Sequence, residues 1–223
     1  MEAAGRIRVG VELVLIHQSI SRGIRISKLY SDIFRQTGFP NGRIGPGFAD
    51  YVRSLSSVLH SHHLAEDELA FPAFRQSLPE APYERLAAEH RLIQPLIEEA
   101  RRGIERALVS PTLQEPLAVL DRALRELEGI WKPHIETEEV HFSAERIDGV
   151  MAPVEQADFM RRLGRHIQEH SGPDYLVVPF TLFNLPAEAR AILSETMPPA
   201  VIQELVPGPW KEKWQPMSPF LLV

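Results

Sequence analysis

The sequence predicts an all-α protein whose centre is a bundle of four long helices. Long stretches place apolar residues at positions i, i+4, i+7 and i+11, and segments dense in glycine and proline separate these stretches. A His-x-x-x-Glu motif also occurs twice, as His62 with Glu66 and as His134 with Glu138. Residues four apart lie on one face of a helix, so a doubled motif of this kind indicates a repeated helical hairpin.

A single histidine precedes each motif at almost the same distance. His17 lies 45 residues before His62, and His90 lies 44 residues before His134. At about 1.5 Å per residue, about 20 residues lead from His17 out to a loop and about 16 lead back to His62, so both reach a similar depth in an antiparallel pair. Four helices can therefore direct these side chains to one level of the bundle.

Composition excludes several classes of protein. The chain has no cysteine, which rules out disulfides, thiolate nucleophiles, Fe–S clusters and cysteine-based zinc sites. A net charge of −6 without a Lys/Arg-rich stripe argues against nucleic acids and anionic membranes as partners. The N-terminus lacks the apolar core of a signal peptide, and no apolar run is long enough for a membrane helix. We expect a soluble, cytoplasmic protein.

The first hairpin is expected to begin with a helix over residues 6–37, in which His17 lies on an otherwise apolar face. The breaker-rich segment 38–47 is expected to be a loop, with the second helix starting near Phe48. Pro72 should kink or end that helix, because proline lacks a backbone donor and clashes with the preceding turn.

The second hairpin is expected to follow the same plan. Its first helix should cover residues 82–108, and Pro95 should bend it about one turn past the histidine. Its second helix should run from about Thr112 to Ile147. Pro133 lies directly before the second motif, so we expect a local distortion of the helix there.

The character of the sequence changes after residue 150, which predicts a metal-binding bundle over 1–150 and a C-terminal helical extension over 151–223. A fifth helix is expected over 154–170, followed by short helices near 186–195 and 198–205. The remaining tail is rich in proline and in aromatic residues. Its apolar content is too high for disorder, so we expect it to pack on the bundle or on another subunit.

The repeated motifs predict a metal site. The candidate ligands are His17, His62, Glu66, His90, His134 and Glu138. Burying unpaired carboxylates is so unfavourable that a bundle core accepts them only when a cation compensates. A set of this size with only nitrogen and oxygen donors suits two ions, with non-haem iron favoured over manganese and zinc. Ferritin-like sites need Glu-x-x-His on two helices, and only Glu138 with His141 fits that pattern.

These motifs resemble those of the hemerythrin-like, or HHE cation-binding, family over roughly residues 6–147. The likeness is carried by His17, the run from His62 to Pro72, Glu89-His90, and His134 to Glu139. The resemblance implies an up-and-down four-helix bundle that holds a non-haem di-iron centre. Glu66 and Glu138 match the bridging carboxylates of the family, and the four histidines match its nitrogen ligands.

The chain departs from the oxygen-carrying members of the family on the third helix. Those proteins have a second histidine one turn after the third-helix ligand, where this chain has Gln94 followed by Pro95. His63, beside His62, is a candidate for the missing nitrogen donor. The predicted ligands are therefore His17, His62, His63, Glu66, His90, His134 and Glu138.

Some assignments stay open at this point. His63 and Asp67 have the same spacing as His62 and Glu66, although the distance from Glu66 to the following Phe-Pro favours the latter pair. His141 is a candidate ligand, a neighbour of the ligands or a pocket residue. The remaining polar residues near the motifs are expected to be solvated or to contact the ligands from outside: His60, Asp67, Glu68 and Glu139. His166 and His170 are expected to be surface or packing residues.

Three functional hypotheses follow. The centre activates dioxygen to oxidise a small organic substrate, or it binds dioxygen reversibly for storage or sensing, or its ion is structural. Family carriers are little more than the bundle, whereas this chain adds some 75 residues, and an altered third-helix position suits an enzyme that needs an open coordination site. We expect an oxidase or oxygenase whose partners are dioxygen and a small molecule, present as a monomer or homodimer.

Overall fold

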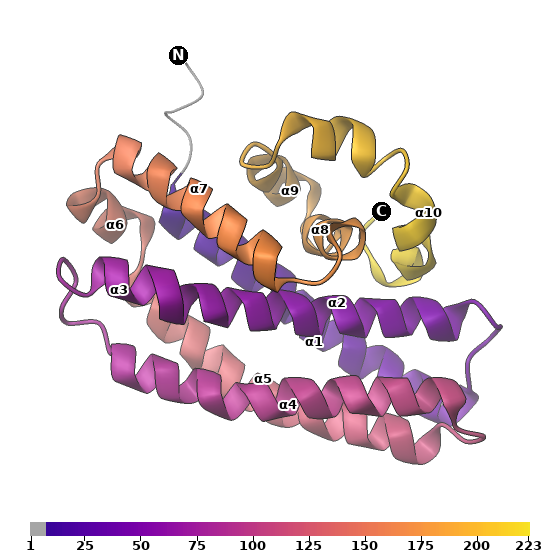
Figure 1. Ribbon diagram of the computed structural model, residues 1–223. Coiled ribbons are helices and arrows are strands. Elements are labelled where there is room, and N and C mark those ends of the chain that lie inside the picture. Colours follow the sequence, from indigo (N-terminus) through magenta and orange to yellow (C-terminus); the bar gives the residue numbers. More distant parts are fainter. Residues whose placement is uncertain (1–7) are drawn as a thin grey trace.

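The computed structural model describes residues 8–223, and this part of the chain contains helices and loops but no strand. Four long helices lie side by side (Figure 1): α1 (Val9–Thr37), α2 (Ile44–Ala65), α4 (Tyr83–Val109) and α5 (Gln114–His141). Both α1 and α4 pack against α2 and α5, so each long helix of this bundle has two long neighbours. In residues 8–223, no helix combines the length and the hydropathy that crossing a membrane requires.

The second long helix changes its winding next to the candidate ligands. After α2 comes a π-helical turn, Glu66–Ala70 (η2), in which the Phe71 N–H donates to the Glu66 carbonyl five residues earlier, and then α3 (Phe71–Phe74). Pro72 lies in the first turn of α3. The sequence predicted that this proline kinks or ends the helix, and the structure has a π turn directly before it and a helix end at Phe74. Such turns are often found at functional sites.

Two predicted helix boundaries were wrong. α2 begins at Ile44 rather than near Phe48, because Pro46 falls in the first turn, where a backbone N–H has no helical partner to lose. α5 ends at His141 rather than near Ile147. The Ser143 hydroxyl accepts a bond from the Arg146 N–H and starts a separate helix, α6 (Ala144–Val150).

The distortion expected at Pro133 is also absent from the secondary structure. α5 stays α-helical on both sides of this exposed proline, and the Thr137 hydroxyl donates a 2.8 Å hydrogen bond to the Pro133 carbonyl. The abnormal turn of the ligand-bearing helices is η2, which precedes a proline instead of following one. Both Pro133 and Gly129, whose carbonyl loses its helical donor to this proline, are exposed, so that carbonyl can bind water and the helix continues.

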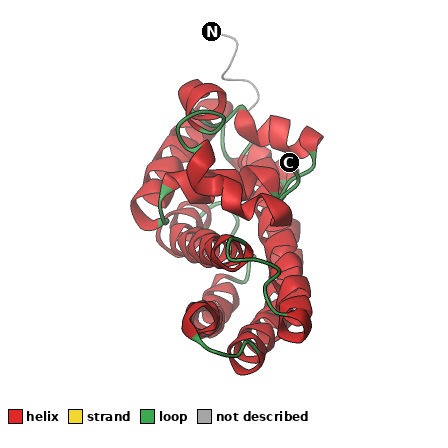
Figure 2. Ribbon diagram, turned by 90° about the vertical axis from the view of Figure 1, so that its right-hand side faces the viewer, coloured by secondary structure: helices red, strands yellow, loops and turns green. Residues whose placement is uncertain are grey.

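The C-terminal region forms a layer over α1 and α2, on the side away from α4 and α5 (Figures 1 and 2). Its elements are α7 (Pro153–His170), α8 (Asp174–Phe183), α9 (Ala187–Ser194), the π turn η3 (Val201–Leu205), α10 (Lys211–Trp214) and the 3-10 helix η4 (Gln215–Phe220). The sequence did not predict α8. This helix is apolar almost all round, so it has no amphipathic period to detect.

The two larger apolar cores of the described residues lie on either side of the candidate ligands. The larger core continues from the bundle into the extension, where Phe220 packs on Phe48 and Tyr51 of α2. The smaller core contains Phe71 and Phe159 at the other end of the molecule. The histidines lie between these two cores.

Candidate metal centre

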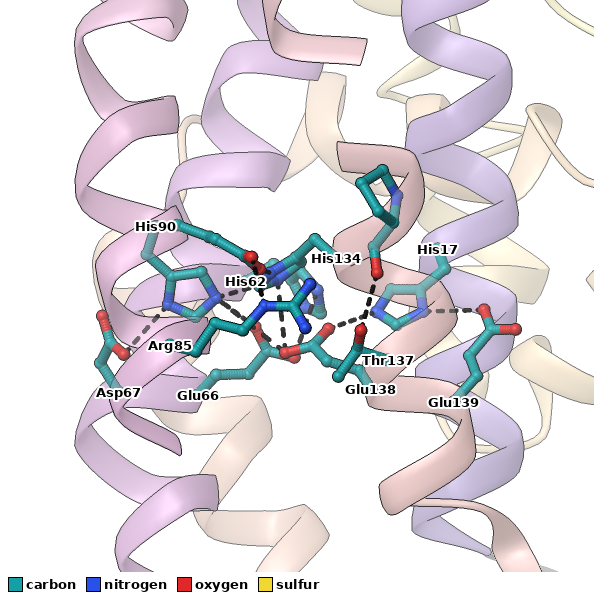
Figure 3. Close-up of polar contacts among 12 residues, drawn as sticks. His17, His62, Glu66, Asp67, Arg85, His90, His134, Thr137, Glu138 and Glu139 are labelled. Atoms are coloured by element: carbon teal, nitrogen blue, oxygen red, sulfur yellow. Dashed lines mark hydrogen bonds and ion pairs between the residues drawn. The ribbon is translucent and has the colours of Figure 1, made fainter. Parts of the chain in front are cut away.

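The structure brings all seven predicted ligands together in the bundle interior, and all of them are buried. They form two groups that share Glu66: His63, Glu66, His90 and His134 in the first group, and His17, His62, Glu66 and Glu138 in the second. Within each group, the donor atoms lie within 4.8 Å of one another. Figure 3 shows the side chains of His17, His62, Glu66, His90, His134 and Glu138 converging from separate helices.

The two glutamates connect the groups. Glu66 places Oε1 3.3 Å from His62 Nε2 and Oε2 3.5 Å from His90 Nε2. Glu138 places Oε2 3.3 Å from His17 Nε2 and Oε1 3.4 Å from His134 Nε2. Each carboxylate therefore directs one oxygen to each group, as two carboxylates must do to join two cations.

Three of the histidines are held from outside by further carboxylates. The Nδ1 atoms lie 2.9 to 3.0 Å from a carboxylate oxygen in the pairs His17 with Glu139, His90 with Asp67, and His134 with Glu89. A carboxylate accepts, so Nδ1 must carry a proton, and in the neutral ring Nε2 keeps its lone pair directed into the cluster. Metal-ligating histidines are typically oriented by such outer partners.

The contact between His90 and His134 favours a bound cation. Their Nε2 atoms lie 3.1 Å apart. Because both rings donate from Nδ1 to carboxylates, neutral forms of both rings would bring two lone pairs against each other. Burial lowers the pKa of His134, but Glu138 and Glu89 outweigh it and raise the pKa, so without a metal a proton on this ring separates the two lone pairs. A metal ion held by both nitrogens removes the same conflict and keeps the two outer hydrogen bonds.

Many polar atoms of the cluster are buried without a hydrogen-bond partner. They are Nε2 of His17 and His62, both ring nitrogens of His63, Oε2 of Glu66 and both carboxylate oxygens of Glu138. Buried polar groups are rarely left unpaired, because each loses its hydration without replacement. A nitrogen-and-oxygen donor set of this kind fits metal ions, so the buried cluster can hold them.

The proton affinities agree with this reading. Burial and the surrounding imidazoles lower the pKa values of His62 and His63 well below the ordinary value, so both rings are neutral, the form that binds metals. Burial and the neighbouring Glu138 raise the pKa of Glu66. For Glu138, burial raises the pKa, but the nearby imidazoles of His134 and His17 outweigh it and lower the pKa. The same contacts, against burial, raise the pKa values of His17 and His134, so in the absence of a metal these two rings tend to hold a proton. Glu66 is thus the carboxylate that lacks a compensating charge from the protein.

The surroundings of the cluster are aromatic. The Trp131 ring lies 5.4 Å from the ring of His17 and 6.0 Å from that of His134, measured between centroids. On the other side, Phe71 stacks on His90 at 5.6 Å. These rings belong to the two apolar cores and shield the polar cluster from bulk water.

The sequence did not reveal every residue that contacts the cluster. Asp67 and Glu139 were expected to be solvated or to contact ligands from outside, and the structure places both against histidines. The contact of Glu89 with His134 was missed, because Glu89 precedes His90 in the chain but faces a histidine of another helix. His141 lies outside both groups.

Other polar residues near the motifs also lie outside the cluster. His60 contacts Gln94, and His166 contacts Glu68. His170 contacts the backbone carbonyl of His166. Each of these histidines has a protein partner, and none of them belongs to the two groups of donor atoms.

The two groups differ in their access to a cavity. The first group has three histidines and the second has two. His62 and Glu66 of the second group line a cavity of about 680 Å³ between the bundle and the C-terminal helices. The position with fewer nitrogen donors is therefore the one beside the cavity.

Comparison with curated proteins and with solved structures gives no match to this chain. Residues 12–145 match the family model of the hemerythrin HHE cation binding domain. The match covers more than half of the 223 residues and contains all seven residues of the cluster. The resemblance seen in the sequence motifs is thereby confirmed, and the chain belongs to the hemerythrin HHE cation-binding domain family.

Proposed function

We propose that the chain is a non-haem di-iron protein that reacts with dioxygen and oxidises a small organic molecule, on an up-and-down four-helix scaffold. His63, His90 and His134 would hold one ion, and His17 and His62 the other, with Glu66 and Glu138 shared between them. When bound, iron would supply the one-electron chemistry that dioxygen requires.

The observation that carries the proposal is the unequal donor set beside a cavity. The His17 and His62 position has fewer nitrogen donors, and His62 reaches the cavity wall. A catalytic metal site keeps a coordination position open for its reactant, whereas a structural site is closed by protein ligands. A cavity that meets the less saturated position favours an enzyme over a structural ion.

The protein residues around the centre have distinct roles in this proposal. The carboxylates of Asp67, Glu89 and Glu139 orient three imidazoles and keep their protons on the outer nitrogens. Trp131 and Phe71 cover parts of the cluster, which favours a reaction with the organic molecule in the cavity beside His62 over leakage of protons and oxidants elsewhere.

Metal analysis is the first test. We expect about two irons per chain in the wild type, as in carboxylate-bridged di-iron bundles. His134→Ala should lose most of this iron, whereas His141→Ala, on the same helix but outside both groups, should keep it. Equal iron contents in the two variants would contradict the assigned centre.

Reaction with dioxygen tests the activity. The iron-loaded protein is reduced without oxygen and then exposed to air, while absorbance and oxygen uptake are followed. We expect an optical change that decays quickly, and faster when an organic substrate is added. A change that persists and reverses when oxygen is removed would indicate the alternative, reversible oxygen binding. No optical change would indicate a structural ion.

A further inference from the structure

The cavity beside His62 is walled by the bundle on one side and by the C-terminal layer on the other. α1 contributes Glu12 and Ile16, α7 contributes Phe159, and α9 contributes Leu193. A volume of about 680 Å³ lies within the range of about 300–1,000 Å³ found for small-molecule pockets. The exposed Arg165 is also part of the lining, so the cavity opens to solvent along α7.

Most of the lining is apolar, and the hydroxyl groups in it already have partners. Ser61 and Thr181 donate to backbone carbonyls of their own helices. Thr196 does the same within its turn. These hydroxyls satisfy their own donors, so they offer little to a ligand beyond their remaining lone pairs.

Glu12 is the exception. Its Oε1 is buried and has no hydrogen-bond partner, although the side chain lines the cavity. Burial raises its pKa to about 7, so near neutral pH the group is present in both protonation states. A carboxyl in an apolar wall with an unused oxygen is unfavourable by itself, which indicates that a ligand supplies the missing partner.

We propose that this cavity binds a neutral, largely apolar small molecule with one hydroxyl group, which hydrogen-bonds to Glu12 while the apolar part reaches His62 and Glu66. A hydroxyl both donates and accepts, so it pairs with either protonation state of a carboxyl. A carboxylate ligand would meet repulsion at Glu12, and both arginines in the lining, Arg161 and Arg165, lie at the exposed rim, where Arg161 is paired with Asp158. That this molecule is the substrate of the oxidation rests on the proposed function, but its binding does not require iron.

Binding is tested on the full chain by displacement of a fluorescent apolar probe, phenylnaphthylamine, with decanol and with decanoate. Both the iron-loaded protein and the protein freed of metal by chelation are used. We expect decanol to displace the probe from both forms, and decanoate to be at least tenfold weaker. Binding that persists without metal separates this inference from the proposed iron chemistry.

Two pairs of variants locate the site. Glu12→Leu should weaken decanol about three- to tenfold, the range for one hydrogen bond, while Glu12→Gln should keep most of the affinity. Ala157→Phe, in the cavity wall, should weaken both probe and decanol at least tenfold. Ala191→Phe, on an exposed face of α9 outside the lining, should change neither. Circular dichroism confirms that each variant is folded.

Three outcomes would overturn the inference. Decanol fails to displace the probe from either form, decanoate binds as well as decanol, or Glu12→Leu and Ala157→Phe bind decanol like the wild type. If decanol binds as expected while the iron-loaded protein does not react with dioxygen, the cavity assignment stands and the proposed oxidation fails.

Discussion

At the scale of single residues, the candidate centre depends on pairs in which a carboxylate holds a histidine from behind. Glu89 of α4 is one of these carboxylates, and it also accepts a bond from Arg85, 2.8 Å away, which fixes its position. The imidazole of His134 is thus oriented by a neighbouring helix. An arrangement of this kind makes the precision of the centre depend on residues that would never touch a metal.

Glu89→Gln should lower the affinity for metal about 10- to 100-fold, because a neutral amide is a weaker acceptor and orients the ring of His134 less firmly. The change leaves both groups of ligand atoms intact. Competition with a chelator of known affinity measures the effect. Glu98→Gln, nine residues further along α4, should behave like the wild type, and a similar loss in this control would assign the effect to general electrostatics.

Glu12 gives a pH dependence of stability whose sign follows from its pKa. The pKa rises from the ordinary 4.5 to about 7 in the folded protein, so between these values the folded state binds more protons than the unfolded state. Stability therefore falls as pH rises through this window. Relative to the wild type, Glu12→Gln should gain about 2 kcal/mol between pH 5 and pH 8.

Urea unfolding of the metal-free proteins at the two pH values checks this expectation. The same experiment with Glu188→Gln, an exposed residue of α9, provides a control that should show no such gain. A constant difference between wild type and Glu12→Gln at both pH values would contradict the raised pKa.

The sequence pointed to the candidate ligands more readily than to the carboxylates that contact them from outside. The candidate ligands repeat at a fixed spacing, and that period is visible in the sequence alone. Asp67 and Glu89 act across helix boundaries, so their role depends on the rotation of neighbouring helices. In the sequence, Glu12 is only a charge that interrupts an apolar run. The packing of the C-terminal layer is what places it in the wall of a cavity.

At the scale of elements, the π turn η2 lets consecutive acids act in different places. Glu66 points into the cluster, and its neighbour Asp67 holds His90 from outside (Figure 3). A π turn adds one residue to the turn and so rotates the chain that follows it. Phe71, the residue after the turn, then stacks on the same His90. The segment around this turn thus contacts His90 through Glu66, Asp67 and Phe71, and His63 of α2 stacks on the same ring at 4.0 Å.

The contact between α2 and η4 gives a prediction for the extension. A methyl group at Gly47 would lie 2.0 Å from the backbone carbonyl oxygen of Pro216, too close to be accommodated without movement. Gly47→Ala should therefore destabilise the protein by about 1–3 kcal/mol, the usual effect of overpacking. Thermal unfolding followed by circular dichroism measures this change.

A second glycine provides the matched control. Gly129 lies inside α5, is exposed, and has open space where a methyl group would stand. Gly129→Ala should stabilise the protein by about 0.5–1 kcal/mol through helix propensity. If both substitutions stabilise, the extension is not seated on α2 as the structure describes.

The long helices were predictable because their apolar period and their flanking breakers agree. The errors arose where a proline is compatible both with a loop and with a position inside a helix. Pro46 was taken as part of a loop but starts α2, and Pro179 was taken as an interruption but lies within α8. Packing in the folded protein decides between loop and helix, since α8 is covered by the bundle and the tail.

At the scale of the whole molecule, burial of the polar cluster and stability of the fold are in competition, because the cluster lowers the free energy of unfolding when no metal is bound. Two glutamates and five histidines occupy an interior that apolar side chains would otherwise fill, and Glu66 has no counter-charge from the protein. Breaking or leaving unpaired a buried charge typically costs several kcal/mol. The apolar cores on both sides, which extend into the C-terminal layer, offset this cost.

This competition predicts that Glu66→Gln has opposite effects with and without metal. In metal-free protein at pH 8, the neutral amide removes a buried carboxylate, so the melting temperature should rise by about 3–8 °C. With metal in about 1,000-fold excess over its dissociation constant, the wild type should gain about 4 kcal/mol, whereas the variant, having lost a shared ligand, should gain much less. The order of stabilities should therefore reverse when metal is added.

The exposed Glu136→Gln on α5 should follow the wild type in both conditions. A metal-free Glu66→Gln variant that melts below the wild type would mean that the protein itself compensates this carboxylate, and the main electrostatic reason for placing a cation here would be lost.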